Sequence, residues 1–518
     1  MSENEKHVKF EGWFDFKKPF VIISLICLLG LSFRVYFFAP DIPLTLDALG
    51  YFWYANDLSI LGHLPNYPSS NNGWPVLLSV FFSIFHSNNP LDYMILQKAV
   101  SVSFSVLTAF PIYLLCTRFF SKQYSVLGAL LFVIDPRIIQ NSLFGITEPL
   151  NIFLLTLSLY FFLSKKDKLI YLSFGLIALS TLVRAEGIFV FFAFCIMQIV
   201  RFKFSKKSIL KVSLAVIIFL LVLSPMILLR IQTNGNDGIV SRIVSGSEVI
   251  TYENQQSNFS DVIIYFTKGF ENFIKFFGWS LVPFFILFIP FGTYIVLKKR
   301  NYENTTLFVI LLLSFLPILY AFFRSISETR YFLPLYPIFV IFSLLAIKEI
   351  SGKIQNKKIL FTLLVVFLLV SSSIFLYFKM EDMEHEKEAL RIANYITENT
   401  KVINEYYPEG KYLMITKLLD TEKFPVLGAD IPPSVKILPI RGFNTLNEYM
   451  EFGHREGLTH LVLDGSERNP IFLNDVFTES EKYPYLIEIF DSYEHGYKYH
   501  VKIFEVDFEK FNSTRDEF

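Results

Sequence analysis

Apolar runs long enough to cross a lipid bilayer recur along the sequence up to residue 378. A transmembrane helix needs about 20 apolar residues, because each residue advances about 1.5 Å across a hydrocarbon layer of about 30 Å. Such runs lie at 19–39, 92–119, 124–141, 147–164, 168–184, 186–201, 208–229, 279–297, 305–323, 331–348 and 359–378. Charged residues make up only 18% of the chain, whereas soluble domains carry about 25%. The sequence therefore predicts a polytopic α-helical membrane protein with eleven spans, or thirteen if residues 74–119 fold into three.

The distribution of lysine and arginine predicts the orientation, because cytoplasmic loops are enriched in both residues. With a cytoplasmic N-terminus, eleven spans place the basic loops inside, at 118–122, 165–168, 201–207, 298–300 and 348–358. The same parity places the irregular segments outside, at 40–73, 135–148, 230–260 and 324–330. We therefore expect a multi-pass protein of a plasma or endoplasmic-reticulum-type membrane, with its working face and its C-terminal region outside the cytoplasm.

Net charge divides the chain near Lys379. Residues 379–518 hold 27 acidic and 16 basic residues, whereas residues 1–378 hold 20 acidic and 31 basic ones. We interpret 1–378 as a transmembrane domain and 379–518 as a soluble extracytoplasmic domain. In the second domain, patterns typical of helices occur at 381–399 and 446–456, and patterns typical of strands at 412–416, 459–464 and 499–506. This alternation predicts a small α/β domain.

The first outer loop carries a carboxylate and an aromatic residue one helical turn apart, Asp47 and Tyr51. Side chains four residues apart lie on the same face of a helix. The pair therefore suits a site cut into the membrane surface. An alternative stays open, in which Asp47 only caps a helix from Ala48 to Leu58 by accepting hydrogen bonds from its first N–H groups.

The second outer loop ends in Thr147 and Glu148, directly before Pro149 and the next apolar run. An acidic side chain at a span end is a candidate for a functional site. The alternative is a local role, because Thr147 would cap the helix while Glu148 interacts with its positive end. Asp135 and Arg137 at the start of this loop are expected to pair with each other.

Two further outer segments carry arginine. The segment 182–187, LVRAEG, contains Arg184 and Glu186, and the segment 328–337, ETRYFLPLYP, contains Glu328, Arg330 and Tyr331. Arginine binds phosphate well, because its planar guanidinium donates two parallel hydrogen bonds. At the bilayer edge it also reaches toward lipid headgroups without any specific ligand.

Taken together and in this order, these segments resemble the GT-C superfamily of integral-membrane glycosyltransferases. The pattern is similar to that of the dolichyl-phosphate-mannose protein mannosyltransferases and the lipid A aminoarabinose transferases, over about residues 15–350. The resemblance implies a GT-C-like membrane domain that transfers a sugar from a polyprenyl or dolichyl phosphate to an acceptor hydroxyl, with inversion. The acceptor would be a protein serine or threonine, as in protein glycosylation, or a glycan or a lipid.

The resemblance also implies roles for individual residues. Asp47 matches the catalytic base, and Glu148 matches the acid that orients the acceptor or Asp47. Arg330 and Tyr331 match the motif that holds the donor phosphate, with Arg184 as a second candidate. The residues that would support these groups are Glu328, Tyr51 and Glu186.

These residue types suit the implied chemistry. A carboxylate takes the proton of the attacking hydroxyl, and an arginine stabilises the phosphate as its bond to the sugar breaks. Many relatives have glutamate after the loop aspartate, whereas Ala48 follows Asp47 here. Asp47 is therefore a single carboxylate at this position, and a divalent metal is possible but not supported by paired acids. We expect no required cofactor and no nucleic-acid partner.

Two other classes of protein stay open. A multi-span transporter or lipid flippase would place ionisable groups and broken helices near the bilayer midplane, whereas the acids and arginines here lie at span ends. A membrane scaffold that presents the acidic domain would tolerate neutral substitutions at Asp47 and Arg330. Within the enzyme class, the sugar, the prenyl carrier and the acceptor stay open.

Overall fold

The computed structural model describes residues 19–67, 71–203, 205–238, 259–324, 326, 328–405, 412–413, 435–440, 442–465 and 469–515. The chain packs as two compact units. The first unit comprises Met1–Phe38, Ser70–Trp74 and Lys98–Phe375, and the second comprises Ala39–Ser69, Pro75–Gln97 and Leu376–Phe518. The assignment of domains on either side of residue 379 stays a prediction.

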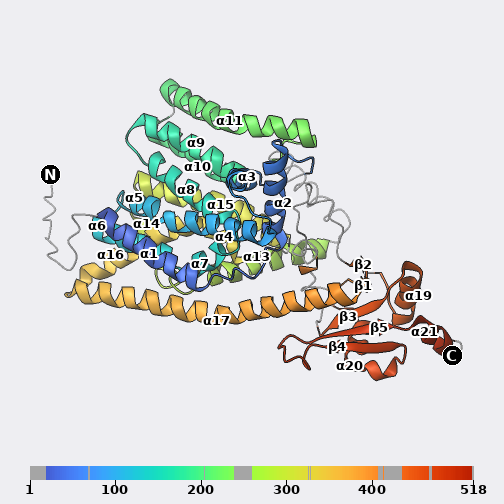
Figure 1. Ribbon diagram of the computed structural model, residues 1–518. Helices are drawn as coiled ribbons and strands as arrows, with labels where there is room; N and C mark the ends of the chain where they lie inside the picture. The colour runs from blue at the N-terminus through green and yellow to red at the C-terminus, as the bar shows by residue number, and fades with distance from the viewer. Residues whose placement is uncertain are drawn as a thin grey trace, which may run out of the picture. The chain divides into compact units, whose positions relative to one another are not determined.

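The first unit is helical, as an apolar chain in lipid must be to satisfy its own backbone hydrogen bonds. Its helices, from blue to yellow in Figure 1, are α1 (Pro19–Tyr36), α5 (Ala109–Cys116), α6 (Lys122–Val133), α7 (Pro136–Ser142), α8 (Glu148–Phe162), α9 (Asp167–Val183), α10 (Gly187–Phe202), α11 (Lys206–Asn234), α13 (Phe259–Leu281), α14 (Ile289–Lys298), α15 (Tyr302–Phe323), the 3-10 helix η1 (Thr329–Leu335) and α16 (Tyr336–Lys353). Three of the described helices belong partly to each unit, α3 (Gly73–Ile84), α4 (Pro90–Leu107) and α17 (Lys357–Asn399).

Six helical stretches among the described residues are long and apolar enough to cross a membrane on their own. They are Pro19–Tyr36, Pro90–Cys116, Ser208–Asn234, Tyr302–Phe323, Thr329–Lys353 and Lys357–Asn399. Other predicted spans correspond to shorter apolar helices such as α6, α8 and α10. The run 279–297 is shared by two helices, α13 and α14. Pro283, two residues after the end of α13, lacks the N–H that would continue that helix. Pro290 lies in the first turn of α14, where proline is tolerated. The number of spans stays a prediction.

Phenylalanine packing fills the interior of the first unit. The rings of Phe162 and Phe194 stack with centroids 4.0 Å apart, and those of Phe191 and Phe219 with centroids 3.9 Å apart. These pairs join α8 to α10 and α10 to α11, while α9 packs along both α8 and α11 (Figure 1). Phenylalanine side chains therefore pack inside this unit and are not confined to a surface that faces lipid.

The second unit contains a five-stranded sheet in the order β2-β1-β3-β5-β4. Strands β1 (Val402–Asn404), β2 (Lys436–Leu438) and β3 (His460–Asp464) are parallel, whereas β5 (Val501–Val506) runs antiparallel to β3 and to β4 (Leu486–Asp491). The register pairs Val462 with Ile503. Figure 1 shows the sheet with helices α19 (Leu446–Glu456), α20 (Ile471–Thr478) and α21 (Phe508–Arg515) around it. The other helices of this unit are α2 (Leu46–Leu61), α3 (Gly73–Ile84), which begins in the first unit, and the 3-10 turn η4 (Ser480–Lys482).

The α/β character of the C-terminal region is confirmed, with differences at its ends. The helix expected at 446–456 and the strands expected at 459–464 and 499–506 are α19, β3 and β5. The helix expected at 381–399 is not separate, because α17 continues without a break from the last apolar run to Asn399. The strand expected at 412–416 is wrong at its first two residues, which form a turn, and its remainder lies outside the described residues.

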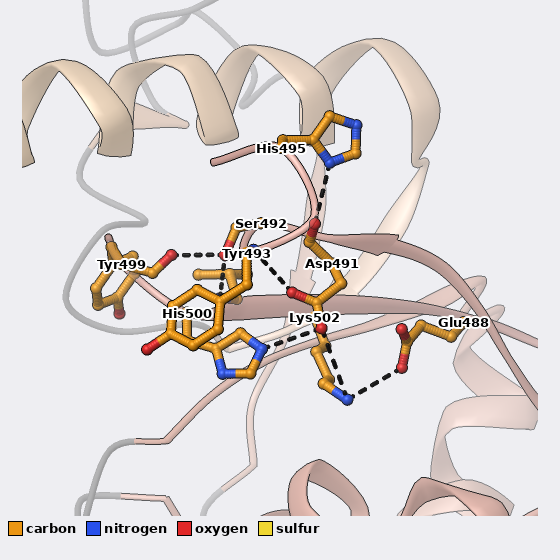
Figure 2. Close-up of polar contacts among 9 residues, drawn as sticks. Glu488, Asp491, Ser492, Tyr493, His495, Tyr499, His500 and Lys502 are labelled. Carbon is orange, nitrogen blue, oxygen red and sulfur yellow. Dashed lines mark hydrogen bonds and ion pairs between the residues drawn. The ribbon is translucent and has the colours of Figure 1, made fainter. Parts of the chain in front are cut away.

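A network of polar contacts orders the β4–β5 hairpin (Figure 2). Asp491 accepts hydrogen bonds from the Tyr493 backbone N–H at 2.8 Å and from His500 Nε2 at 3.1 Å, and Lys502 Nζ donates to Glu488 Oε2 at 3.2 Å. Burial alone would raise the pKa of the Asp491 carboxyl, but these hydrogen bonds and the charges of His500 and Lys502 outweigh it and lower the pKa. The carboxylate of Asp491 therefore serves to hold the hairpin together.

Candidate functional site

Glu148 and Arg184 form a buried ion pair in the first unit. Glu148 is the first residue of α8 and is fully buried, and Arg184 follows the last residue of α9 with 8% of its surface exposed. Arg184 Nη1 donates to Glu148 Oε1 at 2.5 Å, and Arg184 Nη2 donates to Glu186 Oε1 at 3.2 Å. The Thr147 side chain does not cap α8. The role of Glu148 is therefore more than the local one at a helix end, because its carboxylate holds the end of α9.

Tyr331 and Arg330, both on η1, continue this arrangement. The guanidinium carbon of Arg184 lies 5.7 Å from the centre of the Tyr331 ring, and that of Arg330 lies 5.8 Å from it. Two cations thus flank one aromatic ring, within the distance at which its electrons attract positive charge. Glu328 forms an ion pair with Arg330, as the sequence suggested.

We call this set of six side chains the polar cluster; its members are Glu148, Arg184, Glu186, Glu328, Arg330 and Tyr331. Beside it lies a pocket between α8, α10, α15 and η1. Its polar lining comes from Arg184, Glu186, Tyr331, Asn151 and Ser314, and the remaining side chains are apolar, such as Leu155 and Val190. The pocket therefore has apolar walls, with a guanidinium, a carboxylate and a phenol at one side.

The segment 71–74 packs against the end of α9, directly before Arg184. A Cβ added to Gly73 would lie 2.7 Å from the carbonyl carbon of Leu182 and 2.7 Å from the backbone nitrogen of Val183, so only glycine fits there. The Trp74 Nε1–H donates to the carbonyl of Gly145 at 3.1 Å. These contacts connect the first outer segment to the loops that carry Glu148 and Arg184.

Asp47 and Tyr51 lie on α2, in the second unit. The N-cap residue of α2 is Thr45, so the interpretation of Asp47 as an N-cap is wrong, and Asp47 is an exposed residue of the first turn. Leu46 beside it has a φ of +52° although it is not glycine, a conformation that L-residues rarely adopt. Such strain concentrates at functional sites. Gln97 Nε2 fixes this turn by donating to the carbonyl of Ala48 at 2.9 Å.

The side chains of Asp135 and Arg137 do not form the pair that was expected from the sequence. Asp135 is the N-cap of α7 and accepts hydrogen bonds from the backbone N–H groups of Arg137 and Ile138. The Arg137 side chain instead donates from Nε to the carbonyl of Val282 at 2.9 Å. Both residues therefore serve local packing.

Two polar residues near the cluster were not identified from the sequence. Asn151 lies three residues after Glu148, on the same face of α8, and accepts a hydrogen bond from Ser180 at 2.6 Å. Arg230 follows a long apolar run and donates to the side chain of Asn72 at 2.8 Å. The helical spacing from Glu148 and the position of Arg230 at a span end were the available signals.

Within the described ranges, no three histidine, cysteine, aspartate or glutamate side chains come close enough together to hold a metal ion.

A family model described as a predicted membrane protein (DUF2079) matches residues 76–406. The sequence has no match among curated proteins. Both findings leave the activity to be argued from the structure.

Solved structures share the fold of this chain. ArnT from Cupriavidus metallidurans, bound to undecaprenyl phosphate, is 11% identical with a TM-score of 0.56, over 93% of this chain and 97% of ArnT. The apo oligosaccharyltransferase of Archaeoglobus fulgidus is 14% identical with a TM-score of 0.55, over 88% of this chain and 70% of that chain. The same archaeal enzyme, AglB, in complex with an inhibitory peptide and a dolichol-phosphate, has a TM-score of 0.52 at 14% identity, with the same coverage. At these identities the likeness shows the fold, which is that of the GT-C membrane proteins.

Proposed function

The chain belongs to this family of predicted membrane proteins and has the GT-C fold, and from these two facts and the polar cluster we propose that it is a membrane glycosyltransferase. It takes a sugar from a polyprenyl or dolichyl phosphate and transfers it to an acceptor hydroxyl on the extracytoplasmic face. The observation that carries the proposal is the polar cluster beside an apolar pocket. The undecaprenyl phosphate and dolichol-phosphate named for the two similar structures support a lipid-phosphate donor.

Arg330 is the residue that we assign to the donor phosphate. It forms an ion pair with Glu328, and its side chain is partly exposed. A guanidinium donates charge-assisted hydrogen bonds to phosphate oxygens and stabilises the charge that grows on the leaving group. Arg184 is the weaker candidate, because both of its Nη atoms already donate to carboxylates. We assign it a positioning role, in which it holds Glu148 and faces the Tyr331 ring.

Asp47 is the proposed base. The acceptor hydroxyl oxygen forms a bond to the anomeric carbon, the bond from that carbon to the phosphate oxygen breaks, and the lipid phosphate leaves with the electron pair. The hydroxyl proton passes to the Asp47 carboxylate. Because the attack and the departure occur on opposite faces, the product has inverted configuration.

Transfer by purified protein in nanodiscs tests this proposal. The assay compares wild type with Asp47→Asn on labelled polyprenyl-phosphate sugars, with membrane extract as acceptor. Loss of a general base lowers the rate by about 10²- to 10⁴-fold, so Asp47→Asn should lose nearly all transfer. Asp41→Asn is the matched control, because Asp41 lies in the same loop and is exposed, and its ion pair with Lys387 at 3.6 Å is a surface one. Equal transfer by wild type and Asp47→Asn would show that another group is the base.

A further inference from the structure

Arg230 lies on the inward face of α11, although it carries a charge. It is 6% exposed and continues the buried side of the helix, where Phe219 and Leu223 belong to the apolar core at helical spacing. Leu229 and Ile231, its neighbours in the chain, are exposed. An arginine that only reached toward lipid headgroups would lie on that exposed side. The guanidinium of Arg230 is therefore directed into the first unit.

Two asparagine side chains and the backbone after α11 hold this guanidinium. Arg230 Nη1 donates to Asn72 Oδ1 at 2.8 Å, and Nη2 donates to Asn236 Oδ1 at 3.5 Å. Gly238 has a φ of +73° and packs so closely on the guanidinium that an added Cβ would overlap it. Asn72 is 1% exposed, and a charged donor forms a stronger hydrogen bond than a neutral one. Arg230 thus fixes a buried side chain of segment 71–74.

Asn72 connects Arg230 to the end of α9. The next residue, Gly73, approaches the α9 backbone so closely that it leaves no space for a Cβ. Arg230 and Asn72 also line one pocket together with Ala185, the residue that follows Arg184. The hydrogen bond from Arg230 to Asn72 therefore acts on the backbone that carries Arg184.

From these contacts we propose that Arg230 is a positioning residue of the polar cluster. Arg230 holds Asn72, segment 71–74 holds the end of α9, and the end of α9 keeps Arg184 in the cluster. The inference rests on the proposed function, because it assigns Arg230 to the site that we propose for sugar transfer. Its effect is on geometry alone, and a displacement of about 1 Å in a catalytic site lowers a rate by about 100-fold.

Hydrogen–deuterium exchange of the full-length protein in nanodiscs tests the positioning role without an assay of activity. Arg230→Gln and Asn72→Leu each remove the hydrogen bond, so the hydrogen-bonded backbone amides within 184–188 should exchange about ten-fold faster than in wild type. Arg230→Lys keeps a charged donor and should restore part of the protection. Arg118→Gln is the matched control, because Arg118 also lies at a span end, is exposed, and contacts the Tyr160 ring at 4.4 Å. Amides of α6, which packs against α1, α5 and α16, should keep their protection in every variant, which separates a local change from general unfolding.

Transfer and binding assays then separate positioning from contact with the substrate. Arg230→Gln and Asn72→Leu should each lower the kcat of sugar transfer by about 10- to 100-fold. The double variant should be no slower than the slower single variant, because both substitutions remove the same hydrogen bond. The Kd for polyprenyl phosphate should change by about two-fold at most, because the proposed phosphate ligand, Arg330, is still present.

Unchanged exchange within 184–188 in both Arg230→Gln and Asn72→Leu would overturn the inference. A raised Kd for polyprenyl phosphate in Arg230→Gln with unchanged exchange would also overturn it, because Arg230 would then contact the phosphate itself. Additive losses of kcat in the double variant would contradict the connection through Asn72. Faster exchange in the two variants of a protein that transfers no sugar would contradict the proposed function alone, and wild-type transfer rates in both variants would contradict this inference alone.

Discussion

Arg184 is the residue on which the contacts of the polar cluster converge. Its guanidinium donates to Glu148, Glu186 and, at 3.5 Å, to the hydroxyl of Thr147, and it faces the ring of Tyr331. A buried carboxylate that loses its only strong cation is left uncompensated, which costs more than the pair itself contributes. The physical role of Arg184 is thus to pair with the buried carboxylate of Glu148 and to hold it in place.

This role predicts strong coupling between the two side chains. Arg184→Met should lower the free energy of unfolding by about 3 kcal/mol or more, because Glu148 remains buried without its partner. The double variant Glu148→Met with Arg184→Met should be less destabilised than Arg184→Met alone, because no charge is then left behind. Thermal unfolding in nanodiscs measures both. Lys211→Met is the control, since its partner Asp167 is about half exposed and such a pair contributes about 1 kcal/mol or less. Additive effects of the two substitutions would contradict the coupling.

For single residues, the sequence predicted which side chains belong to the candidate site better than it predicted the contacts between them. Glu148, Arg184 and Arg330 were identified as candidates, and the structure brings all three into one cluster. The pairing of Glu148 with Arg184 could not be predicted, because it depends on how α8 and α9 pack.

The elements around the cluster depend on close backbone contact. Segment 71–74 approaches the end of α9 so closely that Gly73 leaves no space for a Cβ. The atoms in its way are backbone atoms of Leu182 and Val183, which cannot rotate aside as a side chain can. The position of Arg184, one residue further, therefore depends on this contact.

A pair of glycine substitutions tests this dependence. Gly73→Ala should lower both the unfolding temperature and the rate of sugar transfer, because the end of α9 must move. Gly50→Ala is the matched control, because Gly50 lies within α2 with no atom within 4 Å of its added Cβ. Alanine in an exposed helix is favoured over glycine by about 1 kcal/mol, so this variant should be at least as stable as wild type. A fully active, stable Gly73→Ala protein would show that the contact is dispensable.

The sequence predicted most elements but not their ends. Apolar runs marked the helices, because burial in lipid requires them. The break between α13 and α14 coincides with Pro283, which a search for long apolar runs does not consider. For α17 the error is the opposite one, because a span and a separate helix were expected where the structure has a single helix. A change from apolar to charged residues alters the surroundings of a helix but does not end it.

For the whole molecule, the fold class was predicted and is confirmed. The helical GT-C fold and the small C-terminal sheet both appear in the structure. The sequence did not reveal that residues 39–69 and 75–97 pack with the C-terminal region as one unit, because periodicity carries no information on contacts between distant segments. The orientation in the membrane stays a prediction that rests on the basic loops.

If the polar cluster binds the phosphate of a lipid donor, the protein should also bind polyprenyl phosphate without a sugar. This probe is the expected product whatever the sugar, so the result does not depend on choosing the right donor. Wild type in nanodiscs should bind it saturably, Arg330→Ala should raise the Kd by about ten- to hundred-fold through loss of a charge-assisted contact, and Asp47→Asn should bind like wild type. Absence of saturable binding, or equal affinity of wild type and Arg330→Ala, would contradict the claim.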